Sequence, residues 1–184
     1  MLELAILGFL AEGPLHGYEL RRRVARLSGY TRPLSDGSLY PAINRLVRDG
    51  LLDRHPEGGT AARRNVLTLT STGRHDLECR LREPAEVDIT DLTRFLVVLA
   101  FLSFLPDADE RDRVLRRRLE FLEQPASFFY DGDTPLRQRD MTDSYREGLF
   151  VIAKATSTAE RRWLRRQLAH DEARDRSPGG DVAR

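Results

Sequence analysis

The 184-residue chain contains one cysteine, Cys79, and one lysine, Lys154. A single cysteine excludes an intramolecular disulfide and a metal cluster built on several thiolates, and it suits a reducing compartment. We expect Cys79 to be buried in a helix. The longest apolar run, residues 95–105, is too short to cross a bilayer. Because the first residues also lack the features of a secretory signal, the sequence predicts a cytoplasmic protein with no membrane partner.

Motifs of the common enzyme classes are also missing. The four histidines are far apart in the chain, without the spacing to one another or to carboxylates that a metal site needs: they are His16, His55, His75 and His170. The sequence has no G-x-S-x-G elbow for a nucleophilic serine and no Walker-type phosphate loop. We therefore expect a protein that is not an enzyme and has no catalytic residues, no metal and no cofactor.

The segment from Ser35 to Leu52 is the most informative part of the sequence. Four apolar residues recur at the spacing of a buried helix face: Leu39, Ile43, Leu46 and Val47. The opposite stripe is Ser38, Ala42, Arg45 and Asp49, with Tyr40, Asn44 and Arg48 beside it. Short polar side chains and an arginine allow close approach and hydrogen bonding, as in a helix that reads the major groove of DNA. The best candidates for contacts to base edges are Ser38, Ala42 and Arg45.

The charge distribution agrees with an anionic partner for the first half of the chain. Residues 1–82 contain 13 arginines against 9 acidic residues, net +4, whereas residues 83–184 contain 17 basic against 20 acidic residues, net −3. The segment 35–52 lies in the basic half. Arginine placed along this half can attract phosphate groups without regard to base sequence.

Patterning predicts three short helices in the first fifty residues. Helices at residues 2–10 and 16–27 precede the helix that Ser35 caps and Gly50 ends. Residues 51–55 and 63–69 then predict a β-hairpin, whose glycine-containing turn carries Arg63 and Arg64. This turn is either a wing that reaches along the phosphate backbone or a solvated loop. Another helix begins at 70–73 and ends at Pro84.

The composition changes after Pro84, where we place a domain boundary. Helices are predicted at 90–105, 107–123 and 136–172, and residues 174–184 are charged and contain SPGG, as in a disordered tail. The expected fold is mainly α with a small β-wing. We expect residues 1–83 to form a winged helix-turn-helix DNA-binding domain and residues 84–173 to form a separate helical domain.

Three sequence blocks closely resemble one known family. HGYEL at 16–20, SDGSLYPAINRLVRDGLL at 35–52 and LTSTGR at 69–74 resemble the winged helix-turn-helix signature of the phenolic acid decarboxylase regulator (PadR) family. The resemblance implies a cytoplasmic homodimeric transcription factor, usually a repressor, whose C-terminal helices form the dimer. It also implies release from DNA when a small-molecule effector binds.

Carried over residue by residue, the resemblance assigns eight residues to the DNA surface: Tyr18, Ser35, Ser38, Tyr40, Asn44 and Arg45, with Arg63 and Arg64 in the wing. A packing role in the core remains open for Tyr18 and Tyr40. The family often has aromatic residues where this chain has Val66 and Leu67, so we assign no base-reading role to the wing.

Aromatic residues of the second half support two interpretations. One is an effector pocket, and the other is the core of a dimer, because aromatic residues at helical spacing usually pack. The candidates are Phe95, Phe101, Phe104, Phe150 and Trp163. Phe150, Ala153 and Trp163 lie on one long predicted helix, which could pair with its counterpart across a twofold axis. The polar face of this helix would stay solvated, and it carries Arg161, Arg162, Arg165 and Arg166.

The leading hypothesis is a homodimeric repressor that binds a pseudo-palindromic operator in double-stranded DNA, with half-sites about one helical turn apart. The alternative is a small-molecule sensing or protein-interaction module in which the winged domain binds a protein partner. The sequence leaves open the effector, the operator, the regulated genes and the choice between repression and activation.

Overall fold

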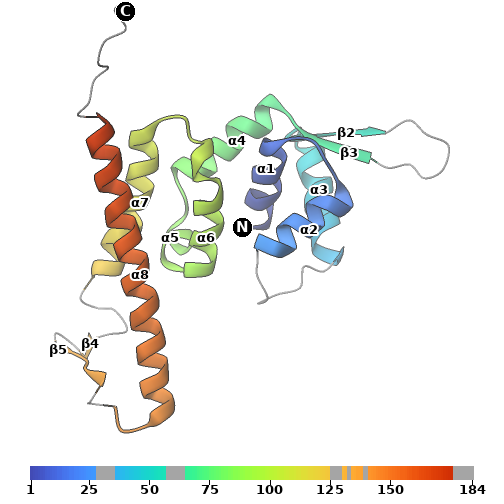
Figure 1. Cartoon of the computed structure of the whole chain (residues 1–184). Helices are drawn as coiled ribbons and strands as arrows, with labels where there is room; N and C mark the ends of the chain where they lie inside the picture. Colours follow the sequence, from blue (N-terminus) through green and yellow to red (C-terminus); the bar gives the residue numbers. More distant parts are fainter. Residues whose placement is uncertain (28–35, 57–64, 125–129, 132–133, 139–140, 176–184) are drawn as a thin grey trace, which may run out of the picture. The chain divides into compact units, whose positions relative to one another are not determined.

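The structure is a computed structural model that describes residues 1–27, 36–56, 65–124, 130–131, 134–138 and 141–175 (Figure 1). The chain divides into two compact units, Met1–Asp107 and Ala108–Arg184. The first unit contains helices α1 (Leu2–Glu12), α2 (Gly17–Leu27), α3 (Asp36–Arg48), α4 (Ser71–Arg82), α5 (Glu86–Thr90) and α6 (Leu92–Phe101), and the short helix η2 (Leu102–Phe104). Its strands are β1 (Leu15–His16), β2 (Leu52–Pro56) and β3 (Asn65–Leu69).

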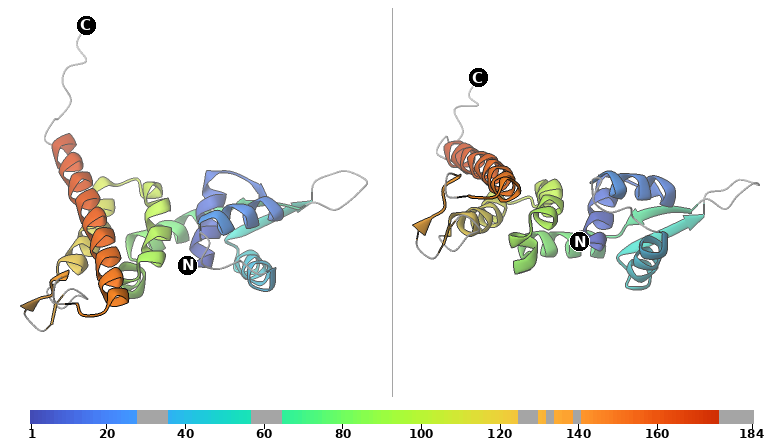
Figure 2. Two further views of the ribbon diagram at one scale, coloured as in Figure 1. Left: turned by 60° about the horizontal axis from the view of Figure 1, so that its bottom comes forward. Right: turned by 90° about the horizontal axis from the view of Figure 1, so that it is seen from below.

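Helix α1 lies at the centre of the first unit and packs against α2, α3, α4, α6 and β3 (Figure 2). Leu4, Ile6, Leu7 and Leu10 are buried in these contacts. Gly8 permits the approach of α6, because a Cβ atom at this position would lie 2.5 Å from the Phe101 ring. The Phe101 ring also meets the Phe9 ring edge to face at 5.0 Å between centroids. Residues after 83 therefore contribute to the core around α1.

The three strands form one antiparallel sheet in the order β1-β3-β2. Leu15 pairs with Leu67, and Arg54 of β2 pairs with the same residue from the other side. The sheet and the hairpin confirm the predicted small β-wing on a mainly helical fold. The turn of the hairpin, residues 57–64, lies outside the described residues.

The corner between α3 and β2 depends on Gly50 and Thr70. Gly50 has a φ of 71°, a left-handed conformation that favours glycine after a helix. The Thr70 hydroxyl donates to the Gly50 carbonyl at 2.8 Å and accepts from the Gly73 amide at 2.9 Å, which caps α4. A Cβ atom on Gly73 would lie 2.1 Å from the Leu51 carbonyl oxygen. These contacts fix the start of the wing relative to α3 and α4.

The second unit contains α7 (Ala108–Glu123), α8 (Ser144–Asp175) and the short paired strands β4 (Tyr130–Asp131) and β5 (Thr134–Pro135). Helices α7 and α8 lie side by side (Figures 1 and 2). Arg118 of α7 is buried and donates to both carboxylate oxygens of Glu160 of α8 at 2.7 and 3.0 Å. This bidentate pair satisfies both charges inside the α7–α8 contact.

Three details differ from the sequence predictions. The long helix begins at Ser144 and not at 136, because the Asp143 carboxylate accepts from the amides of Tyr145 and Arg146 and so caps the helix at that point. Cys79 is exposed, which contradicts its predicted burial. The first compact unit extends to Asp107, beyond the predicted boundary at Pro84, because α6 packs on α1. The functional division into residues 1–83 and 84–173 stays a prediction.

No helix among the described residues is both long enough and apolar enough to span a membrane. Among the same residues, no group of three or more histidine, cysteine, aspartate or glutamate side chains is arranged to hold a metal ion.

Candidate nucleic-acid interface

Helix α3 is amphipathic, as predicted, but its faces are rotated from their predicted positions. Leu39, Ile43 and Leu46 are buried, which confirms three members of the predicted core stripe. Ala42 is 0% exposed, so its placement on the outward stripe is wrong. Val47 is only partly buried and Ala42 takes its place in the core. The outermost stripe therefore follows the spacing of Gly37, Pro41, Asn44 and Arg48, with Tyr40 on one side and Ser38 and Arg45 on the other.

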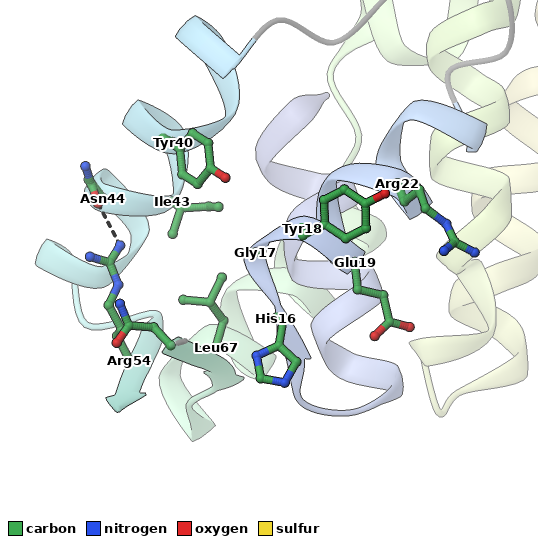
Figure 3. A pocket seen from close by; sticks show the side chains of 11 residues that line it. His16, Gly17, Tyr18, Glu19, Arg22, Tyr40, Ile43, Asn44, Arg54 and Leu67 are labelled. Carbon is green, nitrogen blue, oxygen red and sulfur yellow. Dashed lines mark hydrogen bonds between the residues drawn. The ribbon is translucent and has the colours of Figure 1, made fainter. Parts of the chain in front are cut away.

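A groove of about 770 Å³ lies between the start of α2, the side of α3 that carries Tyr40, and the strands of the wing (Figure 3). It is lined by Tyr18, Glu19 and Arg22 from α2, and by Tyr40, Asn44 and the buried Ile43 from α3. His16, Arg54 and Leu67 complete it from the three strands. Residues from all three elements that usually contact DNA in a winged fold thus meet on one surface.

The two tyrosines of the groove are accessible. Tyr18 is 69% exposed and Tyr40 is 46% exposed. A Cβ atom on Gly17 would lie in van der Waals contact with the Tyr40 ring, 3.7 Å from Cε1, so this ring partly covers the start of α2. The exposed fraction of Tyr18 rules out a role confined to the core. Both phenols present a ring that packs and a hydroxyl that can reach a phosphate oxygen.

Arg54 fixes the side chain of Asn44. Its Nη2 atom donates to Asn44 Oδ1 at 2.7 Å, as Figure 3 shows. Because the amide oxygen accepts from Arg54, the Asn44 Nδ2 hydrogens point away from this bond. The pair therefore offers mainly N–H donors at the centre of the α3 surface. Arg54 was missed in the sequence, since nothing in its strand pattern indicates that β2 returns beside the last turns of α3.

Arg45 is held by an acidic residue of α1. Its Nε and Nη2 atoms donate to Glu3 Oε1 at 3.2 and 3.0 Å. Glu3 Oε2 accepts from Arg80 Nη1 of α4 at 3.3 Å. Burial by itself raises the pKa of Glu3, but the hydrogen bonds from Arg45 and Arg80 outweigh it and hold this pKa below its ordinary value. The carboxylate is thus ionised at neutral pH and bridges two arginines.

Four further residues were assigned to DNA from the sequence: Ser35, Ser38, Arg63 and Arg64. Ser38 is exposed on α3. Ser35, Arg63 and Arg64 lie outside the described residues, so their assignment stays a prediction. Arg22, Glu19 and Arg54 line the groove although they were not assigned to it.

The five aromatic candidates of the second half do not share one compact unit. Phe95, Phe101 and Phe104 belong to the first unit, where Phe95 and Phe101 are buried. Phe150 and Trp163 lie on opposite sides of α8: Phe150 is buried, whereas Trp163 is 37% exposed. Both residues lie on one long helix, as predicted, but they do not share a face of it, because thirteen residues of helix do not return to the same face. Phe150 also lines a hollow of about 440 Å³ with Lys154 and Arg162.

A second apolar stripe runs along the outside of α8. It follows the alternating four- and three-residue spacing of a coiled-coil seam, and its members are Tyr145, Leu149, Ile152, Thr156, Ala159 and Trp163. Tyr145, Leu149, Ile152 and Trp163 are among the exposed large hydrophobic residues. The buried side of α8, which includes Phe150, Leu164 and Leu168, is a different face.

The arrangement of α2, α3 and the β2–β3 hairpin around α1 defines a winged helix-turn-helix domain. Residues 6–79 match the model of the Transcriptional regulator PadR-like family. This match lies within the winged domain, and it names the same family that the sequence motifs of this domain resemble.

Two curated relatives share parts of the chain. The Negative transcriptional regulator PadR of Bacillus subtilis (strain 168) is 26% identical over 113 residues, which cover 61% of this chain and 62% of the relative. An uncharacterized 37.1 kDa protein in transposon TN4556 of Streptomyces fradiae is 38% identical over 76 residues, which cover 41% of this chain and 21% of that protein. The matched region spans less than two thirds of either relative.

Two solved structures are similar over most of the chain. Bacillus subtilis PadR in complex with operator DNA is 21% identical, with a TM-score of 0.44, and the match covers 91% of this chain and 98% of that chain. The smu.1604c protein of Streptococcus mutans UA159 is 19% identical, with a TM-score of 0.43, and the match covers 95% and 94%.

Proposed function

We propose that this protein is a homodimeric transcriptional regulator that binds operator DNA by inserting α3 into the major groove. The observation that carries the proposal is the groove along the Tyr40 side of α3, where Tyr18, Tyr40 and the Asn44–Arg54 pair meet. A helix surface that only faces solvent does not need a side chain such as Asn44 to be held by an arginine of a neighbouring strand. The family match to residues 6–79 gives the same function class.

The charge and chemistry of the groove suit the phosphate backbone and the base edges. Arg22 and Arg54 supply positive charge, and the region 1–82 carries a net charge of +4. The donors of Asn44 and Arg54 match the acceptors N7 and O6 of guanine and N7 of adenine in the major groove. Tyr18 and Tyr40 are placed at the edge of this surface, where hydroxyl groups contact phosphate oxygens.

The exposed seam of α8 supports dimerisation through a second copy of the chain. From Tyr145 to Trp163 the seam is about 27 Å long at 1.5 Å per residue. A twofold axis would place the same apolar stripe of each copy in one interface and remove it from water. Dimerisation would present α3 twice, which suits a pseudo-palindromic operator.

Repression, relief by a small-molecule effector and a cytoplasmic location complete the proposal. Repression is extended from the Bacillus subtilis relative, whose name describes a negative regulator. The effector is proposed from the family resemblance, and the hollow beside Phe150 is its candidate binding site. We found no feature of the described residues that favours an enzyme. A transcriptional regulator of the proposed kind needs no catalytic activity.

The test is selection of duplexes from a random DNA library by the full-length protein, followed by titration of the enriched duplex and of a scrambled duplex. The expected result is a pseudo-palindromic motif bound at least about 10³-fold more tightly than scrambled DNA at physiological salt. Enrichment of no motif, with equal affinity for both duplexes, would overturn the proposal and favour a protein partner for the winged domain.

A further inference from the structure

Glu3 lies outside the groove but accepts hydrogen bonds from Arg45, a residue of the proposed DNA surface. We infer that Glu3 is a positioning residue for sequence specificity, because it grips one edge of the Arg45 guanidinium and aims the other edge at a base. The inference rests on the proposed DNA-binding function. It gives α1, which is the central helix of the fold, a direct part in reading the operator.

The hydrogen bonds to Glu3 occupy one edge of the Arg45 guanidinium and so define which edge can contact a base. Glu3 Oε1 accepts from both Nε and Nη2 of Arg45. A guanidinium has five N–H donors in a planar fork, so this grip leaves the Nη1 end of the fork on the side remote from Glu3. One N–H of Nη1 and the second N–H of Nη2 run parallel at that end, and together they match O6 and N7 of a guanine. Arg45 is half-exposed, which keeps this end within reach of a partner.

The grip is rigid because Glu3 is itself anchored. Only 30% of its side chain is exposed, and its second oxygen accepts from Arg80. Arg80 Nε in turn donates to Asp76 Oδ2 at 2.6 Å. The chain of contacts Asp76–Arg80–Glu3–Arg45 therefore connects α4, α1 and α3. An arginine held in this way loses less conformational freedom on binding than one that moves freely in solvent.

Removal of the Glu3 charge has opposite effects on specific and non-specific binding. A neutral residue removes a negative charge near the DNA surface, so phosphate attraction and non-specific affinity increase. The same change releases Arg45 from its fixed orientation, so the contact to one base becomes weaker. A residue with a purely structural role would not do this, since loss of folded protein reduces both affinities by the same factor.

The experiment compares Glu3→Gln with wild type on the operator that wild type selects and on its scrambled duplex, with the full-length chain. The ratio of the two affinities should fall at least about threefold, because coupling between contacting residues is worth roughly 2- to 150-fold. Affinity for scrambled DNA should stay equal or increase. Glu3→Asp should restore part of the ratio, and thermal unfolding of each variant is recorded in parallel.

A matched control lies on the same helix. Glu12 of α1 accepts from Arg23 of α2 at 2.8 Å and has no contact with α3 among the bonds of the described residues. Glu12→Gln therefore makes the same charge change, and we expect it to leave the affinity ratio unchanged.

A double variant then assigns the effect to Arg45. In Arg45→Ala, the additional change Glu3→Gln should not reduce the ratio further, and both single variants should lose preference at the same base pair of each half-site. Equal changes on both duplexes in Glu3→Gln, or independent effects of the two substitutions on the ratio, would overturn the inference while leaving the proposed function intact. If wild type selects no motif, the proposed function and the inference both fail.

Discussion

The exposed seam of α8 leads to a quantitative prediction for Ile152→Glu. Ile152 is 68% exposed in the single chain and lies in the middle of the seam. Burial of a whole isoleucine side chain is worth about 1.5 to 3 kcal/mol, so burial of the exposed part in two copies contributes about 2 to 4 kcal/mol to a twofold dimer. Loss of this contribution weakens dimerisation roughly 30- to 800-fold. A glutamate that must enter the interface increases the effect further.

The assay is sedimentation equilibrium of wild type, Ile152→Glu and a control, Thr158→Glu. Thr158 is exposed on the same helix but lies off the seam, so its variant should dimerise as wild type does. The temperature of unfolding of monomeric Ile152→Glu should match that of monomeric wild type, because Ile152 is outside the core of the single chain. A dimer of unchanged strength in Ile152→Glu would refute the assignment of the seam to the dimer interface.

Three further predictions concern stability and can be measured by urea unfolding. Thr70→Ala removes the cap of α4 and should cost about 1 to 2 kcal/mol, whereas Thr72→Ala on the exposed side of α4 should be close to neutral. Gly73→Ala should cost about 2 kcal/mol or more because its Cβ would lie 2.1 Å from a backbone oxygen, while Gly148→Ala, with open space around it, should gain up to about 1 kcal/mol; equal effects would contradict the packing argument. The lowered pKa of Glu3 means that its contribution is present above its unfolded-state pKa and is lost as pH falls through the lower folded-state pKa. Glu3→Gln should therefore lose more stability at pH 7 than near pH 3, and an equal loss at both would show that ionisation of Glu3 contributes nothing.

Local signals predicted the elements that position the interface. Gly50 ends α3 because it adopts a left-handed conformation, and the apolar spacing identified Leu39, Ile43 and Leu46 as the buried face. The hairpin followed from strand alternation and turn residues. These features depend on neighbours in the sequence, which periodicity can detect.

The finer placement of side chains depends on contacts between distant segments. Ala42 and Val47 lie on either edge of the core stripe of α3, and their hydrophobicity alone could not decide which of them α1 and the sheet would cover. The partners of Arg45 and Asn44 come from α1 and β2, so no spacing within α3 reveals them. The start of α8 was missed because the preceding residues are compatible with a helix until Asp143 supplies a cap.

The central claim is that the outward side of α3, with Asn44 fixed by Arg54, distinguishes operator DNA from other DNA. The most direct test is the affinity of Asn44→Ala for the selected operator and for its scrambled duplex at one salt concentration. The account predicts that the ratio of the two affinities falls at least about tenfold, because a good contact to a base is worth about 1 to 3 kcal/mol. Affinity for the scrambled duplex should change little. A ratio equal to that of wild type would contradict the claim.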